Sequence, residues 1–307
     1  MMGIIPAAGA GQRIQPLGCS KELLPVGSRP VEGVQRPKAV AEYLVERMIA
    51  AGADQICMVI SAEKTDIIKY FAERQYAAQI FYVVQRQPMG LCDALFRAEP
   101  FARQHEQVLI GLPDTIWFPE NAYRAALDAH GDAAVNLVLF PVVDPAAFDA
   151  VVCDEQNFVQ RVEVKKADAH SHWIWGAVTA TGPAFHALKL LWEARHREDL
   201  FLGDLLNAYI AAGNVVRATH VGEHYMDVCT LEGYRTAQDF ADFPVDASGI
   251  AGGIIDQLHP LFVAVVELGL GQQVGSLHDG LDGIAQIMGE SSEPHDYLGC
   301  HFCRCTW

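Results

Sequence analysis

Residues 3–13, with the sequence GIIPAAGAGQR, form an apolar run that ends in a glycine-rich segment. Such a run is typical of a buried strand that leads into a tight loop. Without a Cβ atom, Gly9 and Gly11 can adopt positive φ angles and let backbone N–H groups approach an anion closely. Arg13 and the later Lys21 add positive charges that suit phosphate oxygens. The stretch therefore predicts a phosphate-binding loop at the carboxyl end of a strand, where open α/β sheets bind their ligands.

Two common glycine motifs fit this loop poorly. The dinucleotide-binding fingerprint would place a third glycine at the position of Ile14, and it would place an acidic residue at the end of the second strand, where this chain has none. The lysine–serine ending of a P-loop is also missing. An oxidoreductase that binds NAD is therefore disfavoured, whereas a glycine-rich turn without a ligand remains the alternative to a phosphate site.

The first 240 residues alternate between expected strands and helices. Apolar residues at positions 40, 44, 45, 48 and 49 share one face of a helix that Gly52 would end. Alternation of this kind implies right-handed crossovers and a mostly parallel sheet. We therefore expect an α/β fold of the Rossmann-like, doubly wound type, with helices on both faces of the sheet. Further strands are expected at 55–60, 79–84, 108–117 and 134–142, and further helices at 66–72, 185–195, 200–211 and 231–240.

Composition and charge narrow the class of protein. The chain has 307 residues, of which 51% are hydrophobic and 20% are charged, as in ordinary globular proteins. Its formal net charge of −16 argues against a nucleic-acid partner and repels anionic substrates at long range. A nucleotide site would therefore depend on local Arg and Lys side chains and on a divalent metal. The start lacks the pattern of a signal peptide, and the apolar run 261–266 is too short to span a bilayer, so we expect a cytoplasmic protein.

The opening loop and the segment after it resemble the signature of a known family. Residues 20–26 (SKELLPV) place a lysine before an apolar-Leu-Pro motif. Together, the two stretches are similar to the sugar-1-phosphate nucleotidyltransferases, especially the glucose-1-phosphate thymidylyltransferase and uridylyltransferase types. The resemblance extends over residues 3–240 and implies the nucleotide-diphospho-sugar transferase type of fold. It also implies that Arg13 and Lys21 neutralise the outer phosphates of a nucleoside triphosphate.

Residues 85–94 (QRQPMGLCDA) match the family pattern Gln-x-x-Pro-x-Gly-Leu-x-x-Ala. The resemblance implies that Gln85 hydrogen-bonds the edge of a pyrimidine base and that Gly90 lets the base lie against the backbone. Taken alone, the stretch is a helix start whose glycine serves packing. The pattern looks more like the thymidylyl form than the uridylyl form, which favours dTTP over UTP. One methyl group separates the two bases, however, and a hydrophobic contact discriminates such a difference only weakly.

Two aspartates are candidates for a magnesium site. Asp114 follows an expected strand, and Mg²⁺ commonly binds one or two carboxylates together with substrate phosphates. A lone aspartate at a strand end is otherwise a helix cap or a turn residue. The family resemblance makes Asp114 one metal ligand and Asp227, in the sequence Asp-Val-Cys-Thr, the second. Cys229 stands where the family has glycine, and we expect it to crowd the backbone near the metal.

The motifs that contact the sugar phosphate in the family match this chain less closely. The sequence EVKK, which contains Glu163 and Lys165, takes the place of a Glu-Glu-Lys-Pro segment. This implies that Lys165 holds the sugar phosphate and that Glu163 contacts the substrate, while Gly176 corresponds to a glycine that touches the sugar. The chain departs from the family at 149–152, which is DAVV for Tyr-Gly-Val-Val, and at Val164, where the family has a glutamate. Residues 148–164 are expected to form a hairpin-like wall of the sugar pocket.

Taken together, the motifs predict an enzyme that transfers a nucleotidyl group from dTTP or UTP to a sugar-1-phosphate, with glucose-1-phosphate favoured. We expect Mg²⁺ as the cofactor and pyrophosphate as the second product. Arg13, Lys21 and Lys165 would be the catalytic residues, because positioning and electrostatic stabilisation carry this chemistry. A non-catalytic protein that binds nucleotides or sugar phosphates is the alternative. Nucleic acid and membranes are not expected as partners, and a homo-oligomer is left open.

The family resemblance ends before the last part of the chain. We expect residues 1–243 to form the catalytic domain and residues 244–307 to form a C-terminal tail of unknown role. Near its end the tail contains Cys300, Cys303 and Cys305, whose thiols suit zinc. Structural zinc usually takes two separated cysteine pairs. A poorly ordered tail with free thiols is therefore the favoured interpretation.

Overall fold

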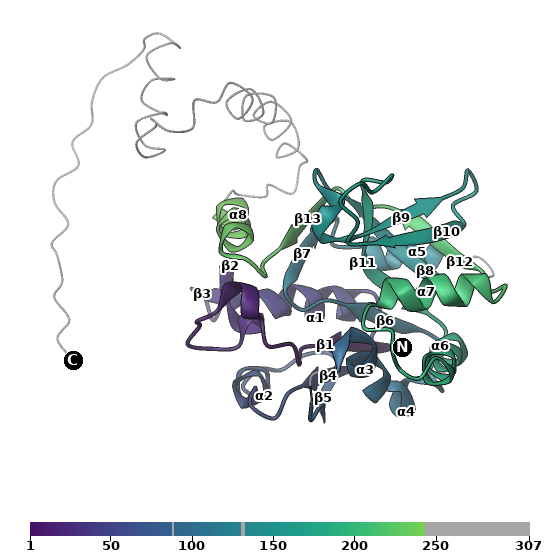
Figure 1. Cartoon of the computed structure of the whole chain (residues 1–307). Helices are drawn as coiled ribbons and strands as arrows, with labels where there is room; N and C mark the ends of the chain where they lie inside the picture. Colours follow the sequence, from purple (N-terminus) through teal and green to yellow (C-terminus); the bar gives the residue numbers. More distant parts are fainter. Residues whose placement is uncertain (88, 130–132, 243–307) are drawn as a thin grey trace, which may run out of the picture. The chain divides into compact units, whose positions relative to one another are not determined.

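The computed structural model describes residues 1–87, 89–129 and 133–242, and within them the chain builds a central sheet of nine strands (Figure 1). The sheet consists of β1 (Met2–Pro6), β4 (Gln55–Ile60), β5 (Gln79–Val84), β6 (Val108–Gly111), β8 (Val135–Pro141), β9 (Asp149–Cys153), β10 (Val159–Val164), β11 (Trp173–Ala180) and β12 (Val216–His220). Its order is β10-β9-β11-β6-β1-β4-β5, with β8 beside β11 and β12 beside β8. Strand β1 lies inside the sheet and runs parallel to both β4 and β6.

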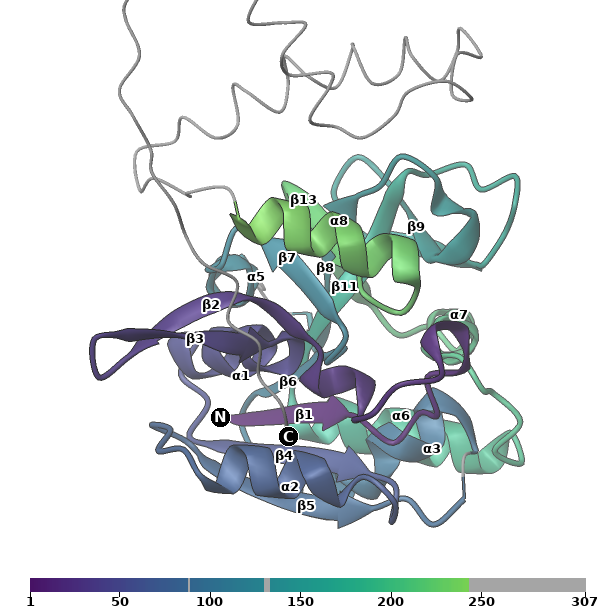
Figure 2. The same cartoon turned by 90° about the vertical axis from the view of Figure 1, so that its left-hand side faces the viewer.

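Helices cover both faces of this sheet because successive residues of a strand point to opposite sides (Figures 1 and 2). In β1, Ile4 belongs to one buried core and Ile5 to the other. The first core receives α3 (Gly90–Arg97), α4 (Glu99–Ala102), α6 (Gly182–Ala194) and α7 (Leu202–Ala211), and the second receives α1 (Val40–Ala50), α2 (Thr65–Ala72) and α5 (Ala122–Asp128). The expected fold class is confirmed as a mostly parallel α/β sheet between two helical layers, in which β11 runs antiparallel to β6 and β8.

A third, smaller core lies beside the central sheet. Its elements are β2 (Pro25–Val31), β3 (Val34–Ala39), β7 (Thr115–Phe118), β13 (His224–Asp227) and α8 (Leu231–Asp242). Strands β2 and β3 form one antiparallel pair, and β7 and β13 form another. Helix α8 contacts both β2 and β13 (Figure 2). The hydroxyl of Tyr234 donates to the carbonyl of Pro25 at 3.0 Å. Buried Val26, Ile116, Met226 and Ala237 join β2, β7, β13 and α8 into one apolar cluster, and β3 is attached through its pairing with β2.

The structure corrects the expected strand at 108–117. Strand β6 ends at Gly111, and the chain then leaves the central sheet to form β7, which pairs with β13. Pro113 lies in the break, where its missing N–H cannot continue a strand ladder. Asp114 therefore lies in a connection between two sheets and not near the end of one long strand.

The hairpin of β2 and β3 was not predicted from the sequence. Its turn consists of Glu32 and Gly33, whose φ angles of 51° and 79° match the positive values that two-residue hairpin turns prefer. Glycine at the second position was the available signal. Within the described residues, every helix is too short or too polar to cross a bilayer. The expected tail at 244–307, with its three cysteines, lies outside the described residues.

Gly176 occupies a crowded position in β11. A Cβ atom at this residue would lie 2.5 Å from Cε2 of Tyr225 and 2.7 Å from Cδ2 of Phe140. The rings of Phe140 and Tyr225 are themselves in contact, with their centroids 5.6 Å apart. Aromatic side chains thus fill the space beside the glycine that the sequence analysis assigned to the sugar.

Glu163 in β10 ties this strand to the connection that follows it. Its carboxylate accepts hydrogen bonds from the backbone N–H of His170 at 2.7 Å, from the His170 ring at 2.8 Å and from Nη2 of Arg161 at 3.0 Å. Burial by itself would raise the pKa of Glu163, but these donors outweigh it and lower the pKa to about 2. A short 3-10 turn, η3 (Pro145–Ala147), leads into the hairpin of β9 and β10.

Replacing Gly176 by alanine is expected to destabilise the fold because the added methyl group overlaps two packed rings. We expect the free energy of unfolding of Gly176→Ala, measured by urea titration, to fall by about 1–3 kcal/mol. Gly9→Ala is the matched control, since no atom lies within 4 Å of its added Cβ, and its free energy should stay within about 0.5 kcal/mol of wild type. Equal free energies of unfolding for both variants would show that the rings of Phe140 and Tyr225 move aside without destabilising the fold.

Glu163 gives the stability of the chain a defined pH dependence. Because its folded pKa lies below its unfolded value, its contribution is complete above about pH 4.5 and disappears as the pH falls towards 2. The stability difference between wild type and Glu163→Gln should therefore be constant at neutral pH and shrink between pH 4.5 and 2. Urea titrations over this range measure it, and Glu155→Gln, in the exposed turn of the same hairpin, supplies the background effect of losing one carboxylate. A difference that stays constant down to pH 2 contradicts the assignment.

Candidate active site

The glycine loop after β1 is built around Gly11 and Lys21. Gly11 adopts φ 65° and ψ 32°, the left-handed conformation that favours glycine, and begins the 3-10 turn η1 (Gln12–Ile14). A Cβ atom at Gly11 would lie 2.9 Å from Cδ of Lys21. Lys21, in the 3-10 turn η2 (Lys21–Leu23), thus lays its aliphatic stem against the loop backbone. Gly9 faces open space, which leaves that part of the loop accessible.

A cavity of about 590 Å³ opens at the carboxyl ends of β1, β4 and β5. Its lining includes Ala10, Ser20, Lys21, Ser61, Lys64 and Gln85. This is the edge of an open α/β sheet at which ligands bind, and the volume falls within the range of small-molecule pockets. The predicted phosphate loop and the predicted base-binding segment therefore border one cavity.

Asp114 and Asp227 meet because of the register between two short strands. Strand β13 pairs with β7 so that Asp227 stands opposite Thr115, the neighbour of Asp114. The N–H of Val228 also donates to the carbonyl of Asp114 at 2.9 Å. One side-chain ligand atom each of Asp114, Asp227 and Cys229 lies within 4.8 Å of the others. Two carboxylates that are far apart in the sequence thus share one small site.

The carboxylate of Asp114 is buried and has two side-chain partners. Its Oδ2 atom pairs with the ammonium group of Lys21 and accepts a hydrogen bond from Sγ of Cys229 at 2.6 Å. Burial would raise the pKa of Asp114, but the charge of Lys21 and the thiol hydrogen bond hold the pKa below its usual value. Burial and the negative charge of Asp114 raise the pKa of Cys229, so its thiol is neutral at physiological pH.

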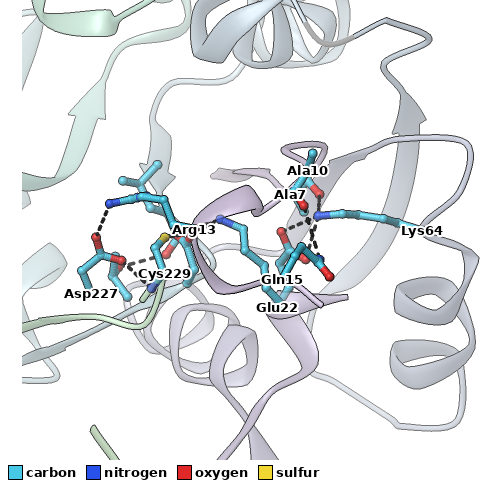
Figure 3. A network of polar contacts seen from close by, with 12 residues as sticks. Ala7, Ala10, Arg13, Gln15, Glu22, Lys64, Asp227 and Cys229 are labelled. Carbon is cyan, nitrogen blue, oxygen red and sulfur yellow. Dashed lines mark hydrogen bonds and ion pairs between the residues drawn. The ribbon is translucent and has the colours of Figure 1, made fainter. Parts of the chain in front are cut away.

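Arg13 lies on the other side of the acidic pair. Its Nη1 atom is 3.7 Å from Oδ2 of Asp227, and 59% of its side chain is exposed. Figure 3 shows Arg13 extending towards Asp227 and away from Lys64. Both predicted cations, Arg13 and Lys21, therefore lie beside the two predicted metal ligands. Their position suits phosphates that are bound between the loop and this acidic pair.

Lys64 is a cavity residue that the sequence analysis missed. Its ammonium group donates to both carboxylate oxygens of Glu22, at 2.7 and 2.8 Å, and to the carbonyl of Ala7 at 2.8 Å (Figure 3). Glu22 is almost fully buried, and Lys64 compensates its charge. The available signal was position, because Lys64 follows β4, the strand beside β1, at the same edge of the sheet.

Gln85 and Gly90 border the cavity from the β5–α3 connection. The amide nitrogen of Gln85 donates to Oδ2 of Asp93 at 2.6 Å, which holds this side chain against α3. Gly90 has φ 90°, and a Cβ atom there would lie 3.0 Å from the carbonyl oxygen of Leu200. Gly90 thus meets a steric need of the backbone, while contact of Gln85 with a base stays a prediction. Pro88 of the same motif lies outside the described residues.

The residues assigned to the sugar phosphate already contact other parts of the chain. Nζ of Lys165 lies 4.0 Å above the centre of the Phe201 ring. Glu163 accepts a hydrogen bond from the backbone N–H of His170, and Gly176 is covered by aromatic rings. Asp149, at the start of the divergent DAVV segment, accepts a hydrogen bond from Nε1 of Trp175 at 3.2 Å. Their substrate contacts remain predictions.

The chemistry of Asp114 and Asp227 fits a divalent cation. Carboxylate oxygens are the ligands that Mg²⁺ prefers, and the ion commonly takes its remaining ligands from water and from substrate phosphates. Cys229 is a third potential ligand, but a thiol is soft and suits other metals better. Among the described residues, these three form the cluster with metal-binding geometry.

Known proteins resemble this chain along most of its length. A glucose-1-phosphate thymidylyltransferase of Neisseria gonorrhoeae is 28% identical over 254 residues, which cover 78% of this chain and 82% of that protein. A UTP–glucose-1-phosphate uridylyltransferase of Haloferax volcanii is 24% identical over 246 residues, with coverage of 79% and 95%.

Solved structures share the fold. A UDP-glucose pyrophosphorylase of Acinetobacter baumannii matches with a TM-score of 0.65 at 21% identity, over 84% of this chain and 99% of its own. A UTP-bound UGPase of the same organism matches with a TM-score of 0.62 at 19% identity, over 83% and 98%. The model of the family described as nucleotidyl transferase matches residues 2–242 of this chain. The chain therefore belongs to the nucleotidyl transferase family, and it is a nucleotidyltransferase.

Proposed function

We propose that this enzyme transfers the nucleotidyl group of dTTP or UTP to a sugar-1-phosphate, with glucose-1-phosphate as the first candidate. The meeting of Asp114 and Asp227 beside Lys21 and Arg13, next to a nucleotide-sized cavity, carries this proposal. The relatives named above act on glucose-1-phosphate with a pyrimidine nucleotide, which supports the choice of substrates. The products are a nucleotide sugar and pyrophosphate.

The reaction needs charge stabilisation more than it needs proton transfer. A phosphate oxygen of the sugar-1-phosphate attacks the α-phosphorus, and the bond from that phosphorus to the leaving pyrophosphate breaks. The nucleophile is already an anion at neutral pH, so no general base is required. The activation barrier arises because two anions must come together and because negative charge develops on the leaving group. Positioned cations lower this barrier. Lys21 and Arg13 supply such charges, and Lys165 would hold the attacking phosphate.

Asp114 and Asp227 would hold Mg²⁺ in this enzyme. The ion would add two positive charges against the triphosphate, which matters in a chain with a net charge of −16. The chain's own residues contribute the site for the ion, the cations beside it and the cavity that orients the nucleotide. The match of residues 85–94 to the thymidylyl form favours dTTP, and the weak discrimination of one methyl group makes UTP a second substrate.

A grid of substrates tests the proposal directly. Pyrophosphate release should require a pyrimidine triphosphate and a sugar-1-phosphate together, with dTTP and glucose-1-phosphate the most active pair. Chelation with EDTA should abolish release, and added Mg²⁺ should restore it. The proposed reaction is contradicted if every pair of substrates is inactive, or if pyrophosphate release does not depend on the sugar phosphate.

Neutralising either aspartate should disable the enzyme. Asp114→Asn and Asp227→Asn are each expected to lose at least about 2 kcal/mol of transition-state stabilisation, which corresponds to about a 30-fold lower kcat/KM. Steady-state kinetics at saturating Mg²⁺ measure the loss, and thermal unfolding checks that each variant folds. Asp128→Asn, on an exposed face of α5, is the matched control and should keep the wild-type rate. Turnover near wild type in Asp114→Asn removes this residue from the metal site.

A further inference from the structure

Cys229 lies inside the acidic cluster although the proposed reaction has no use for a thiol. Its Sγ atom donates to Oδ2 of Asp114 at 2.6 Å and lies 3.5 Å from Nζ of Lys21. Its backbone N–H donates to Oδ1 of Asp227 at 2.8 Å. Cys229 is buried, with 7% of its surface exposed. The sulfur is thus held at the point where both proposed magnesium ligands converge.

A sulfur ligand changes which metals a site prefers. Mg²⁺ binds oxygen, whereas Zn²⁺ and Cd²⁺ bind thiolates strongly and accept carboxylates as well. With bonds of about 2.3 Å to sulfur and about 2.1 Å to oxygen, these ligand atoms lie about 3.6 Å apart around a tetrahedral zinc ion. The ligand atoms of Asp114, Asp227 and Cys229 lie within 4.8 Å of one another, so small side-chain movements bring them to one ion.

We propose that Cys229 is a third metal ligand that lets the Asp114–Asp227 pair bind a zinc-class ion in competition with Mg²⁺. On binding, the thiol loses its proton to solvent as the sulfur–metal bond forms, and Lys21 gives up its contact with Oδ2 of Asp114. No electron transfer is involved. The enzyme is then inhibited by low concentrations of Zn²⁺ or Cd²⁺, because these ions hold the site in a thiolate-bound form. This inference rests on the metal pair of the proposed function.

The backbone around Cys229 supports a preorganised ligand. The register of β13 against β7 and the hydrogen bond from Val228 to Asp114 hold this segment in place. The hydrogen bond from the backbone N–H of Cys229 to the carboxylate of Asp227 keeps these two potential ligands close together. A site with three protein ligands and an open position is the arrangement that zinc adopts where it also contacts substrate or water.

Cobalt and cadmium report the sulfur–metal bond directly. The experiment uses the full chain with Cys300, Cys303 and Cys305 replaced by serine, so that the thiols near the C-terminus do not contribute. In this background we compare Cys229 with Cys229→Ser, which keeps a hydrogen-bond donor of similar size, and with Cys229→Gly, the residue of the family pattern. Titration with Co²⁺ or Cd²⁺ is followed by thiolate-to-metal charge-transfer absorption in the ultraviolet. Thermal unfolding confirms that each variant folds.

We expect the Cys229 protein to show a saturable charge-transfer band that both variants lack, and its affinity for Cd²⁺ to be at least about tenfold higher. Half-inhibition by Zn²⁺ in the presence of Mg²⁺ should shift to a concentration at least about tenfold higher in Cys229→Ser. Identical bands and affinities in all three proteins overturn the inference. The charge-transfer band does not depend on turnover, so the two proposals fail separately. A protein that shows the band but is inactive contradicts only the proposed nucleotidyl transfer. A protein that is active but lacks the band contradicts only the proposed thiolate ligand.

Discussion

The buried carboxylate of Asp114 is the feature on which the site depends, because a buried charge is costly unless other groups compensate it. Lys21 supplies positive charge from the loop after β1, and Cys229 supplies a hydrogen-bond donor from the segment after β13. Asp114 itself lies between β6 and β7. One ionised group thus ties together three segments that are distant in the sequence. The same negative charge makes the site suitable for a cation, so a single requirement serves both folding and chemistry.

The positive side chains of the site are already neutralised within the chain. Lys21, Arg13 and Lys64 each face a carboxylate. A phosphate that bound here would therefore have to replace an acidic side chain as the partner of each cation, in a chain with a net charge of −16. Arg13 is the easiest to recruit, since it is largely exposed and 3.7 Å from its partner. Lys64 is the hardest, because it donates to both oxygens of a buried carboxylate. Among the three cations, Arg13 is therefore the one whose acidic partner a phosphate would replace at the lowest cost.

Local patterns predicted the strands of the sheet, while contacts between distant elements left no local signal in the sequence. The strands expected at 55–60 and 79–84 have these bounds in the structure, because an apolar run bounded by polar residues is a local signal. The pairing of Asp114 with Asp227 came from the family resemblance and not from periodicity, since it depends on the register of β7 and β13. The packing of two aromatic rings over Gly176 has no signature in its neighbouring residues at all.

The residues proposed to bind the sugar-1-phosphate differ from one another in the strength of the contacts that hold their side chains within the chain. Lys165 contacts the Phe201 ring at 4.0 Å, an interaction of about 0.5–2 kcal/mol, which a charge-assisted hydrogen bond to phosphate can match or exceed. Glu163 has three donors on its carboxylate and would lose them by turning to a sugar hydroxyl. Turning to a phosphate would therefore cost Lys165 less than turning to a sugar hydroxyl would cost Glu163. Asp149, in the segment where the chain departs from the family pattern, is likewise engaged within the chain, because it accepts a hydrogen bond from Nε1 of Trp175.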